Sequence, residues 1–116
     1  MIKGLDCSNY KAIYVDMDGV VVRSSELING ALESISYFGD CGEVYILSNN
    51  STRSREKFAK NLEDLGISLP PGSVINSAFV LAKYLLEHEG PLDSFVVGEE
   101  GLGEELDLMG HKIVNP

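Results

Sequence analysis

The chain has 116 residues, enough for one ordinary domain with a buried core. Hydrophobic residues make up 44% and charged residues 23% of it, which excludes a disordered chain, and no apolar run approaches the roughly 18 residues of a membrane span. The formal net charge of −9 argues against a nucleic-acid partner, because phosphate backbones are bound by lysine and arginine.

The first ten residues form a lead-in to the first predicted strand. Residues 1–6 contain no continuous apolar stretch of the kind found in a secretory signal, so we expect the protein in the cytoplasm. Cys7 and Cys41 stand far apart in the sequence and in no metal-binding or redox spacing. We therefore expect both to be reduced thiols rather than a disulfide.

Two aspartates follow the first apolar run. The stretch from Ala12 to Asp16 predicts a buried parallel strand, and Asp18 and Gly19 come directly after it. Open α/β sheets bind ligands at the C-terminal ends of their strands, and a turn beginning at Met17 can bring both carboxylates into one pocket. Two like charges held close together need a cation such as magnesium, beside which one carboxylate attacks phosphorus and the other transfers a proton. The alternative is a pair of solvated acids at a strand-to-turn corner.

A helix and a second strand are predicted next. The helix opens at Asn29-Gly30, carries apolar residues at spacings of three, and is expected to stop at Gly39. The second strand covers about Val44 to Leu47. A hydroxyl and two amides, Ser48, Asn49 and Asn50, end this strand.

The helix that follows is predicted from about Arg53 to Leu65, with Ser51 or Thr52 as its N-cap and Gly66 as its stop. Ser48 and Asn50 can serve merely as turn and cap residues. Next to a strand that ends in two aspartates, the same hydroxyl and amides suit a phosphate. The basic residues that follow indicate either a solvated helix face or an anion site, and they are Arg53, Arg55, Lys57 and Lys60.

The second half continues the alternation of strand and helix. A loop or hinge is expected at residues 69–72, and the apolar runs predict strands at Val74–Asn76, at Phe95–Val97 and from Lys112 onward. Helices are predicted over Ser77–Glu87, with Leu81 and Leu85 on one face, and along a stripe of Leu102, Leu106 and Met109 that Gly110 ends. The glycines at 98–103 lack the dinucleotide-binding spacing. We expect His88 and His111 at the surface, because neither lies in a metal-binding pattern.

Two of these segments together resemble one family. Residues 16–20, Asp-Met-Asp-Gly-Val, and residues 47–54, Leu-Ser-Asn-Asn-Ser-Thr-Arg-Ser, are similar to the first and second motifs of the haloacid dehalogenase-like phosphatases. The similarity is greatest to the branch of nitrophenyl phosphatases and NagD-type sugar or glycolate phosphatases. It extends over nearly the whole chain, because residues 75–78 and 96–102 look like that branch's run into its cap domain.

The resemblance implies a chemistry for the two aspartates. Asp16 would be the nucleophile that takes the phosphoryl group as an aspartyl-phosphate, and Asp18 the general acid and base. Magnesium would be held by the Asp16 carboxylate and the Asp18 backbone carbonyl. The implied substrate is a small phosphorylated metabolite.

The resemblance also implies a phosphate-binding set. Ser48 and the amides around Asn49 and Asn50 would hold the transferring phosphoryl oxygens, while Gly19 lets the backbone turn sharply close to the ligand. A receiver-like phospho-acceptor domain also clusters acids at strand ends, but it takes them from different strands and does not predict Ser-Asn-Asn after the second.

The expected fold is α/β, a Rossmann-like haloacid dehalogenase core with a mainly parallel sheet and the beginning of an inserted α/β cap. Residues 1–72 are expected to form the N-terminal part of the core, and residues 73–116 its third strand and an incomplete start of the cap. The family's third-motif lysine and fourth-motif carboxylates have no counterpart in the sequence. We therefore expect a partial chain or a homo-oligomer, and the alternative to a phosphatase is a catalytically inactive binding or assembly module.

Overall fold

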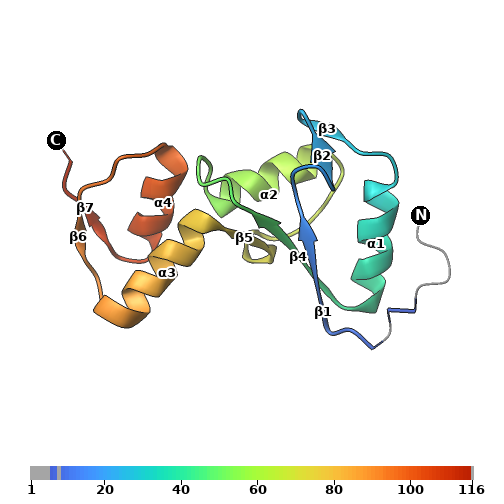
Figure 1. Ribbon diagram of the computed structural model, residues 1–116, viewed down its shortest axis with the longest axis horizontal. Helices are drawn as coiled ribbons and strands as arrows, with labels where there is room; N and C mark the ends of the chain where they lie inside the picture. Colours follow the sequence, from blue (N-terminus) through green and yellow to red (C-terminus); the bar gives the residue numbers. More distant parts are fainter. Residues whose placement is uncertain (1–5, 8, 116) are drawn as a thin grey trace.

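The computed structural model describes residues 6–7 and 9–115, so most of the stretch expected to lack a signal lies outside the described residues. A three-stranded parallel sheet is the centre of the fold, and its strands lie in the order β1-β4-β5 (Figure 1). The strands are β1 (Ala12–Asp16), β4 (Glu43–Ser48) and β5 (Val74–Asn76). The predicted strand bounds are met within one residue, and the α/β class with a mainly parallel sheet is confirmed.

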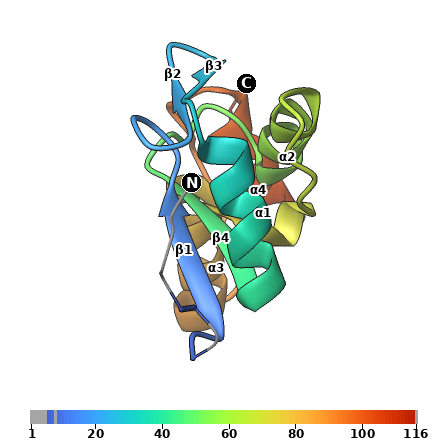
Figure 2. The same ribbon diagram turned by 90° about the vertical axis from the view of Figure 1, so that its right-hand side faces the viewer.

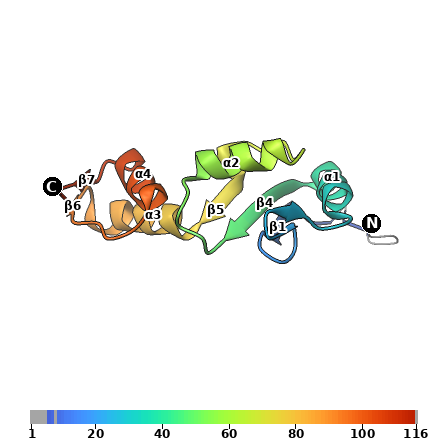
Figure 3. The same ribbon diagram turned by 90° about the horizontal axis from the view of Figure 1, so that it is seen from above.

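Two helices cover one face of this sheet. α1 (Ala31–Cys41) and α2 (Arg55–Asp64) connect successive strands and lie on the same side, as the view from above shows (Figure 3). Ile46 and Val74, which are paired in register, and Leu62 of α2 have no exposed surface. Side chains alternate along a strand, so these residues make one buried face of the sheet.

The opposite face of the sheet is exposed. Tyr14 and Tyr45 are partners in register and stack there with their ring centroids 5.4 Å apart. Tyr14 retains 60% of its surface, so the stack covers little of the sheet. Asp16, Leu47 and Ile75 occupy matching positions at the C-terminal end of this face.

The helix ends differ from the predicted ones. α1 continues through Gly39 to Cys41, because a single glycine costs a helix only about 1 kcal/mol and does not end it. α2 begins two residues later than predicted, and its N-cap is Ser54, whose hydroxyl accepts the amide N–H of Lys57 at 3.3 Å. Gly66 does end α2, with a φ of 94°.

A short hairpin stands beyond the C-terminal end of β1 (Figure 2). It consists of β2 (Val22–Arg23) and β3 (Glu26–Leu27). Ser24 and Ser25 in its turn have φ values of 51° and 67°, the positive values that a tight two-residue hairpin requires.

The remaining elements pack together beside the sheet, at the far end of the molecule from α1 (Figure 1). They follow the short helix η1 (Pro71–Ser73) and β5, and comprise α3 (Ser77–Glu89), β6 (Asp93–Ser94), α4 (Glu100–Leu108) and β7 (Lys112–Ile113). α3 buries Ala78 and Ala82, whereas Leu81 on the predicted face is 43% exposed.

The predicted strand at Phe95–Val97 is wrong. The strand β6 begins two residues before the predicted one and pairs with β7. Phe95 and Val97 lie outside it and are 69% and 87% exposed. The side chain of Asn115 donates to the Val96 carbonyl and accepts its amide N–H, at 2.6 and 2.7 Å. A side-chain amide thus takes the place of a neighbouring strand at this point.

His111 is buried, contrary to the surface position predicted for it. Its side chain is held between two backbone groups, the Ala82 carbonyl at 2.9 Å from Nε2 and the Leu92 amide at 3.1 Å from Nδ1. Because Nδ1 accepts the Leu92 N–H, Nε2 is the protonated nitrogen and donates to Ala82. His88 is exposed, as expected. Among the residues described, no helix is both long and apolar enough to span a bilayer.

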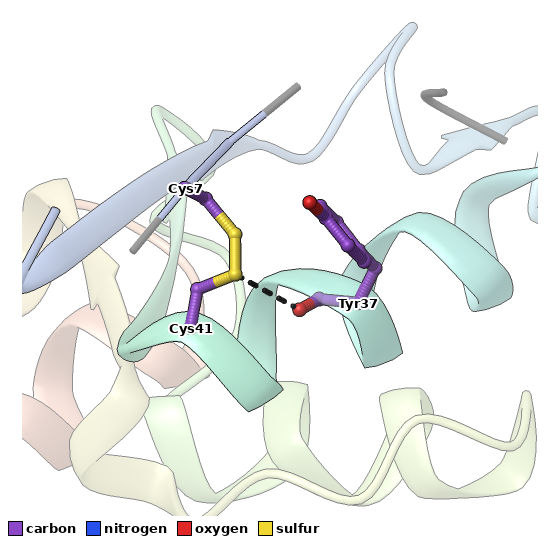
Figure 4. Close-up of a disulfide and its surroundings, with 3 residues drawn as sticks. All are labelled: Cys7, Tyr37 and Cys41. Atoms are coloured by element: carbon purple, nitrogen blue, oxygen red, sulfur yellow. Dashed lines mark hydrogen bonds between the residues drawn. A yellow bond between two sulfur atoms is a disulfide. The ribbon is translucent and has the colours of Figure 1, made fainter. Parts of the chain in front are cut away.

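The expectation of two reduced thiols is also wrong in this structure. Cys7 and Cys41 form a disulfide that joins the lead-in to the last residue of α1 (Figure 4). The two residues are 34 apart in sequence, but the lead-in passes the C-terminal end of α1 and their Cα atoms lie 5.6 Å apart, a normal separation for a disulfide. Sequence spacing alone cannot reveal this approach.

We expect Cys7→Ser to lower the free energy of unfolding of the oxidised protein by about 4 kcal/mol, the loop-closure entropy of a 34-residue separation. Denaturant unfolding with and without a reductant measures the change, and the wild-type protein and the variant should become similar once reduced. A thiol titration that finds two free cysteines in the native, unreduced protein would contradict the disulfide.

Candidate active site

Asp16 lies at the C-terminal end of β1, on the exposed face of the sheet. It lines a hollow of about 450 Å³ together with Ser48, Asn49 and Ser77. Its carboxylate has no hydrogen-bond or salt-bridge partner among the described residues. Both oxygens of Asp16 are therefore available to a ligand.

Asp18 lies just beyond the strand and lines a different hollow. Met17 is buried, and its carbonyl accepts the amides of Val21 at 2.9 Å and Val22 at 3.2 Å, so the chain turns sharply here. Gly19 has a φ of 82°, which the turn requires and which an L side chain would strain. The expected single pocket with both carboxylates is not what the structure shows.

The hollow of Asp18 measures about 620 Å³. It is lined by Ser24 and Ser25 of the hairpin turn and by Asn50 and Arg53. The predicted residues are thus divided into two groups: Asp16 with Ser48 and Asn49, and Asp18 with Asn50. Gly19 follows both aspartates and forms the turn that leads from them into the hairpin.

The residues after β4 form a compact turn. Ser48 is buried, and its hydroxyl accepts the amide of Asn50 at 3.1 Å. The Asn50 side-chain oxygen in turn accepts the amide of Thr52 at 2.8 Å and its hydroxyl at 2.5 Å. These short-range bonds fix the path of the backbone between β4 and α2.

Asn76 also holds this turn, a role that was not predicted from the sequence. It is buried at the end of β5, where its oxygen caps α3 by accepting the Phe79 amide at 2.8 Å. Its amide nitrogen donates to the Arg53 carbonyl at 2.9 Å. Next to it, the Ser77 hydroxyl donates to the Asn49 carbonyl at 3.0 Å. An asparagine between a strand and a helix is a capping signal that could have been recognised.

Helix α4 packs against the start of α2. The Arg55 guanidinium Nε donates to Glu105 Oε2 at 2.8 Å, and Glu105 is buried. The Gly101 amide donates to the Thr52 carbonyl at 3.0 Å, and a Cβ on Gly101 would lie 2.3 Å from the Arg53 carbonyl carbon. Glycine is therefore required at 101 by the close approach of the two segments.

Acidic residues of α4 partly neutralise the basic residues that follow the turn. Lys57 Nζ lies 2.9 Å from Glu104 Oε1 and 3.1 Å from Glu100 Oε2. The hydrogen bond from Lys57 lowers the pKa of Glu104, and the same bond raises the pKa of Lys57. Lys57 lies on an exposed helix face, in agreement with the solvated-face alternative, whereas Arg55 is bound by the buried Glu105 of α4.

The donor atoms at the end of β1 suit a hard cation. Asp16 and Asp18 offer exposed carboxylates, and magnesium is commonly bound by one or two carboxylates while it keeps several waters. Within the described part of the chain, no group of three or more acidic, histidine or cysteine side chains is placed to hold a metal ion. Any ion here would be bound mainly by water, substrate oxygens and these two residues.

A parallel sheet with an aspartate turn and a Ser-Asn-Asn turn at its carboxyl edge places the protein among the α/β proteins that bind ligands at strand ends. The chain belongs to the haloacid dehalogenase-like hydrolase family, because the model of that family matches residues 13–112. It is 36% identical over 98 residues to phosphoglycolate phosphatase 1A of Arabidopsis thaliana. The aligned region covers 82% of this chain and 27% of that protein.

Solved structures agree with this assignment. The p-nitrophenyl phosphatase from Archaeoglobus fulgidus matches with a TM-score of 0.81 and 32% identity, over 90% of this chain and 40% of that one. Glycerol phosphate phosphatase from Mycobacterium tuberculosis, in complex with magnesium, matches with a TM-score of 0.81 and 26% identity. This match covers 93% of this chain and 33% of that phosphatase. The resemblance to the nitrophenyl phosphatase branch is confirmed. The chain spans 27% to 41% of the length of the curated relatives it matches.

Asn76→Ala should lower the free energy of unfolding by about 2 kcal/mol, roughly 1 for the lost helix cap and 1 for the hydrogen bond to Arg53. Chemical denaturation measures the change. Asn49→Ala is the matched control, because Asn49 is exposed and uses only its backbone carbonyl, so its effect should stay within about 0.5 kcal/mol. Equal losses in the two variants would contradict the role given to Asn76.

The Lys57–Glu104 pair makes stability depend on pH in one direction. Because the folded state lowers the pKa of Glu104, the pair stabilises the protein above the unfolded pKa, and the gain is lost as the pH falls through the lowered folded value. Glu104→Gln should therefore reduce the melting temperature slightly at pH 7 and leave it unchanged at pH 2. A difference that is the same at both pH values would count against the pair.

Proposed function

We propose that this chain carries the nucleophile and phosphate-binding turn of a magnesium-dependent phosphatase that hydrolyses small phosphate monoesters through an aspartyl-phosphate. The observation that carries the proposal is the position of Asp16. Its unpaired carboxylate lies at the C-terminal end of β1, in one hollow with Ser48 and Asn49. Relatives named as phosphatases of phosphoglycolate and p-nitrophenyl phosphate support the same class of reaction.

In the first proposed step, a carboxylate oxygen of Asp16 attacks the phosphorus, and the bond from phosphorus to the alcohol oxygen breaks. Asp18 gives its proton to the departing oxygen, which leaves as the alcohol. Since Asp18 lines the neighbouring hollow with Ser24 and Ser25, its side chain must turn toward Asp16 to do this.

In the second proposed step, Asp18 takes a proton from water while the water oxygen attacks the phosphorus of the aspartyl-phosphate. The bond to Asp16 breaks, and inorganic phosphate leaves with the Asp16 carboxylate restored. Ser48 and the amides of Asn49 and Asn50 would bind the phosphoryl oxygens and stabilise the charge that develops on them. The Asn50 amide donates to the Ser48 hydroxyl in this structure, so it would exchange that bond for one to the phosphate.

Magnesium, held by the Asp16 carboxylate and the Asp18 backbone carbonyl, would neutralise part of the phosphate charge when bound. The fit rests on the donor set at the end of β1. The magnesium complex of the similar glycerol phosphate phosphatase supports the choice of metal.

Further features of the proposal come from the resemblance and from the charge and apolar patterning of the sequence. Residues 1–72 would be core and residues 73–116 its third strand and the start of the cap, and the protein would work in the cytoplasm on a small phosphorylated metabolite. Neither nucleic acid nor membrane would be a partner, and a second copy or further chain would supply the remaining charges of the site. A disulfide is rare in that compartment, so the cysteine measurement above also tests the location.

A catalytically inactive binding or assembly module is the second candidate. It is favoured by the small donor set, since the proposed metal ligands are one carboxylate and one backbone carbonyl and no group of three or more acidic, histidine or cysteine side chains is placed to hold a metal among the described residues. Loss of a single preorganised electrostatic group costs other enzymes about 100- to 1000-fold in rate. Such a module would keep the phosphate turn and lose turnover.

Asp16→Asn should abolish magnesium-dependent release of phosphate from p-nitrophenyl phosphate, because an amide oxygen is a poor nucleophile for phosphorus. The assay compares the wild-type protein and the variant with and without magnesium, alongside mass and oligomeric state in solution. Asp40→Asn is the matched control, because Asp40 is an exposed residue of α1 at the other end of the sheet. Turnover that survives Asp16→Asn would refute Asp16 as nucleophile, and a folded wild type without turnover would favour the inactive module.

A further inference from the structure

We infer that Glu105 is a positioning residue that acts through Arg55 to hold the turn of residues 48–52 in the shape that binds phosphate. This inference rests on the proposed function, since it assigns that turn to phosphate. Glu105 lies on α4, distant in sequence from the turn, and takes no part in the proposed chemical steps.

The contact between Glu105 and Arg55 is buried and charged. Glu105 is 1% exposed and Arg55 has 19% of its side chain exposed, with Nε and Oε2 2.8 Å apart. The guanidinium carbon of Arg55 also lies 3.7 Å from the centroid of the Phe79 ring. Arg55 is thus fixed by an acid on one side and an aromatic face on another.

The second oxygen of Glu105, Oε1, is buried with no hydrogen-bond partner among the described residues. Burying a carboxylate in this way is costly, and an apolar pair of similar volume would often join two helices at least as well. What the ion pair adds is a fixed direction for Arg55, the first residue of α2. The direction of Arg55 is important here because the backbone just before α2 includes the residues proposed to bind phosphate.

The backbone before α2 is held at two consecutive residues, one by α4 and the other by the end of β5. Thr52 gives its carbonyl to the Gly101 amide on α4, and Arg53 gives its carbonyl to the Asn76 side chain. Thr52 also donates twice to Asn50, and the Asn50 amide donates to the Ser48 hydroxyl. The Gly101–Thr52 hydrogen bond thus joins α4 to the proposed phosphate-binding residues, and the Glu105–Arg55 pair holds α4 against the start of α2 three residues further along the chain.

Glu105→Gln tests the inference because it keeps the size of the side chain and removes its charge. We expect the dissociation constant for inorganic phosphate, measured by NMR titration of the Ser48, Asn49 and Asn50 amides with magnesium present, to rise at least tenfold. Hydrogen exchange of the amides at 49–54 should become faster as well. Asp107→Asn, which removes an exposed charge from the same helix, should change neither quantity.

Leu106→Val tests whether a loss of stability alone explains the effect, because it trims a buried side chain on the same helix and keeps both members of the Arg55–Glu105 pair. If Leu106→Val destabilises the protein as much as Glu105→Gln and weakens phosphate binding equally, Glu105 is structural and the inference is wrong. Unchanged binding and exchange in folded Glu105→Gln would also overturn it. If the wild type binds no phosphate, the proposed function fails, while faster exchange at 49–54 in Glu105→Gln alone would still establish the positioning contact.

Discussion

Parallel pairing of three short strands is the constraint on which the rest of this structure depends. Because β1, β4 and β5 run in one direction, their C-terminal ends meet at one edge, and the residues after each strand become neighbours. Asp16, the turn that begins at Ser48, and Asn76 come together for this reason alone. Each helix that follows a strand then starts at the same edge, with its N-terminus toward the site.

Features that depend on local pattern were predictable from the sequence. The three sheet strands, the α/β class and the end of α2 at Gly66 follow from apolar runs and glycine positions, and all three agree with the structure. Asp16 and the Ser48 turn were predicted as site residues because strand ends in such folds bind ligands. The N-cap at Ser54 was missed because Ser51, Thr52 and Ser54 are equally good caps in isolation, and Asn50 uses Thr52 for the turn.

Features that depend on contacts between distant residues were not predictable. Nothing in the sequence near Cys7 indicates that it meets Cys41, and nothing near His111 indicates two backbone groups at the right separation. The apolar run at Phe95–Val97 has the composition of a strand, but β7 pairs with Asp93 and Ser94, which come just before this run. Glu105 looked like one acid among many, since its role depends on an arginine 50 residues away.

The pairing of acids with bases explains why the proposed chemistry needs a metal. Arg55 and Lys57 lie just after the proposed phosphate-binding turn, but Glu105, Glu104 and Glu100 neutralise them. Arg53 is the basic residue of the hollow that also contains Asp18 and Asp64. An anionic substrate approaching Asp16 and Asp18 would therefore meet excess negative charge from the described residues. A divalent cation reverses that balance, which is the physical reason to expect that phosphate release depends on magnesium.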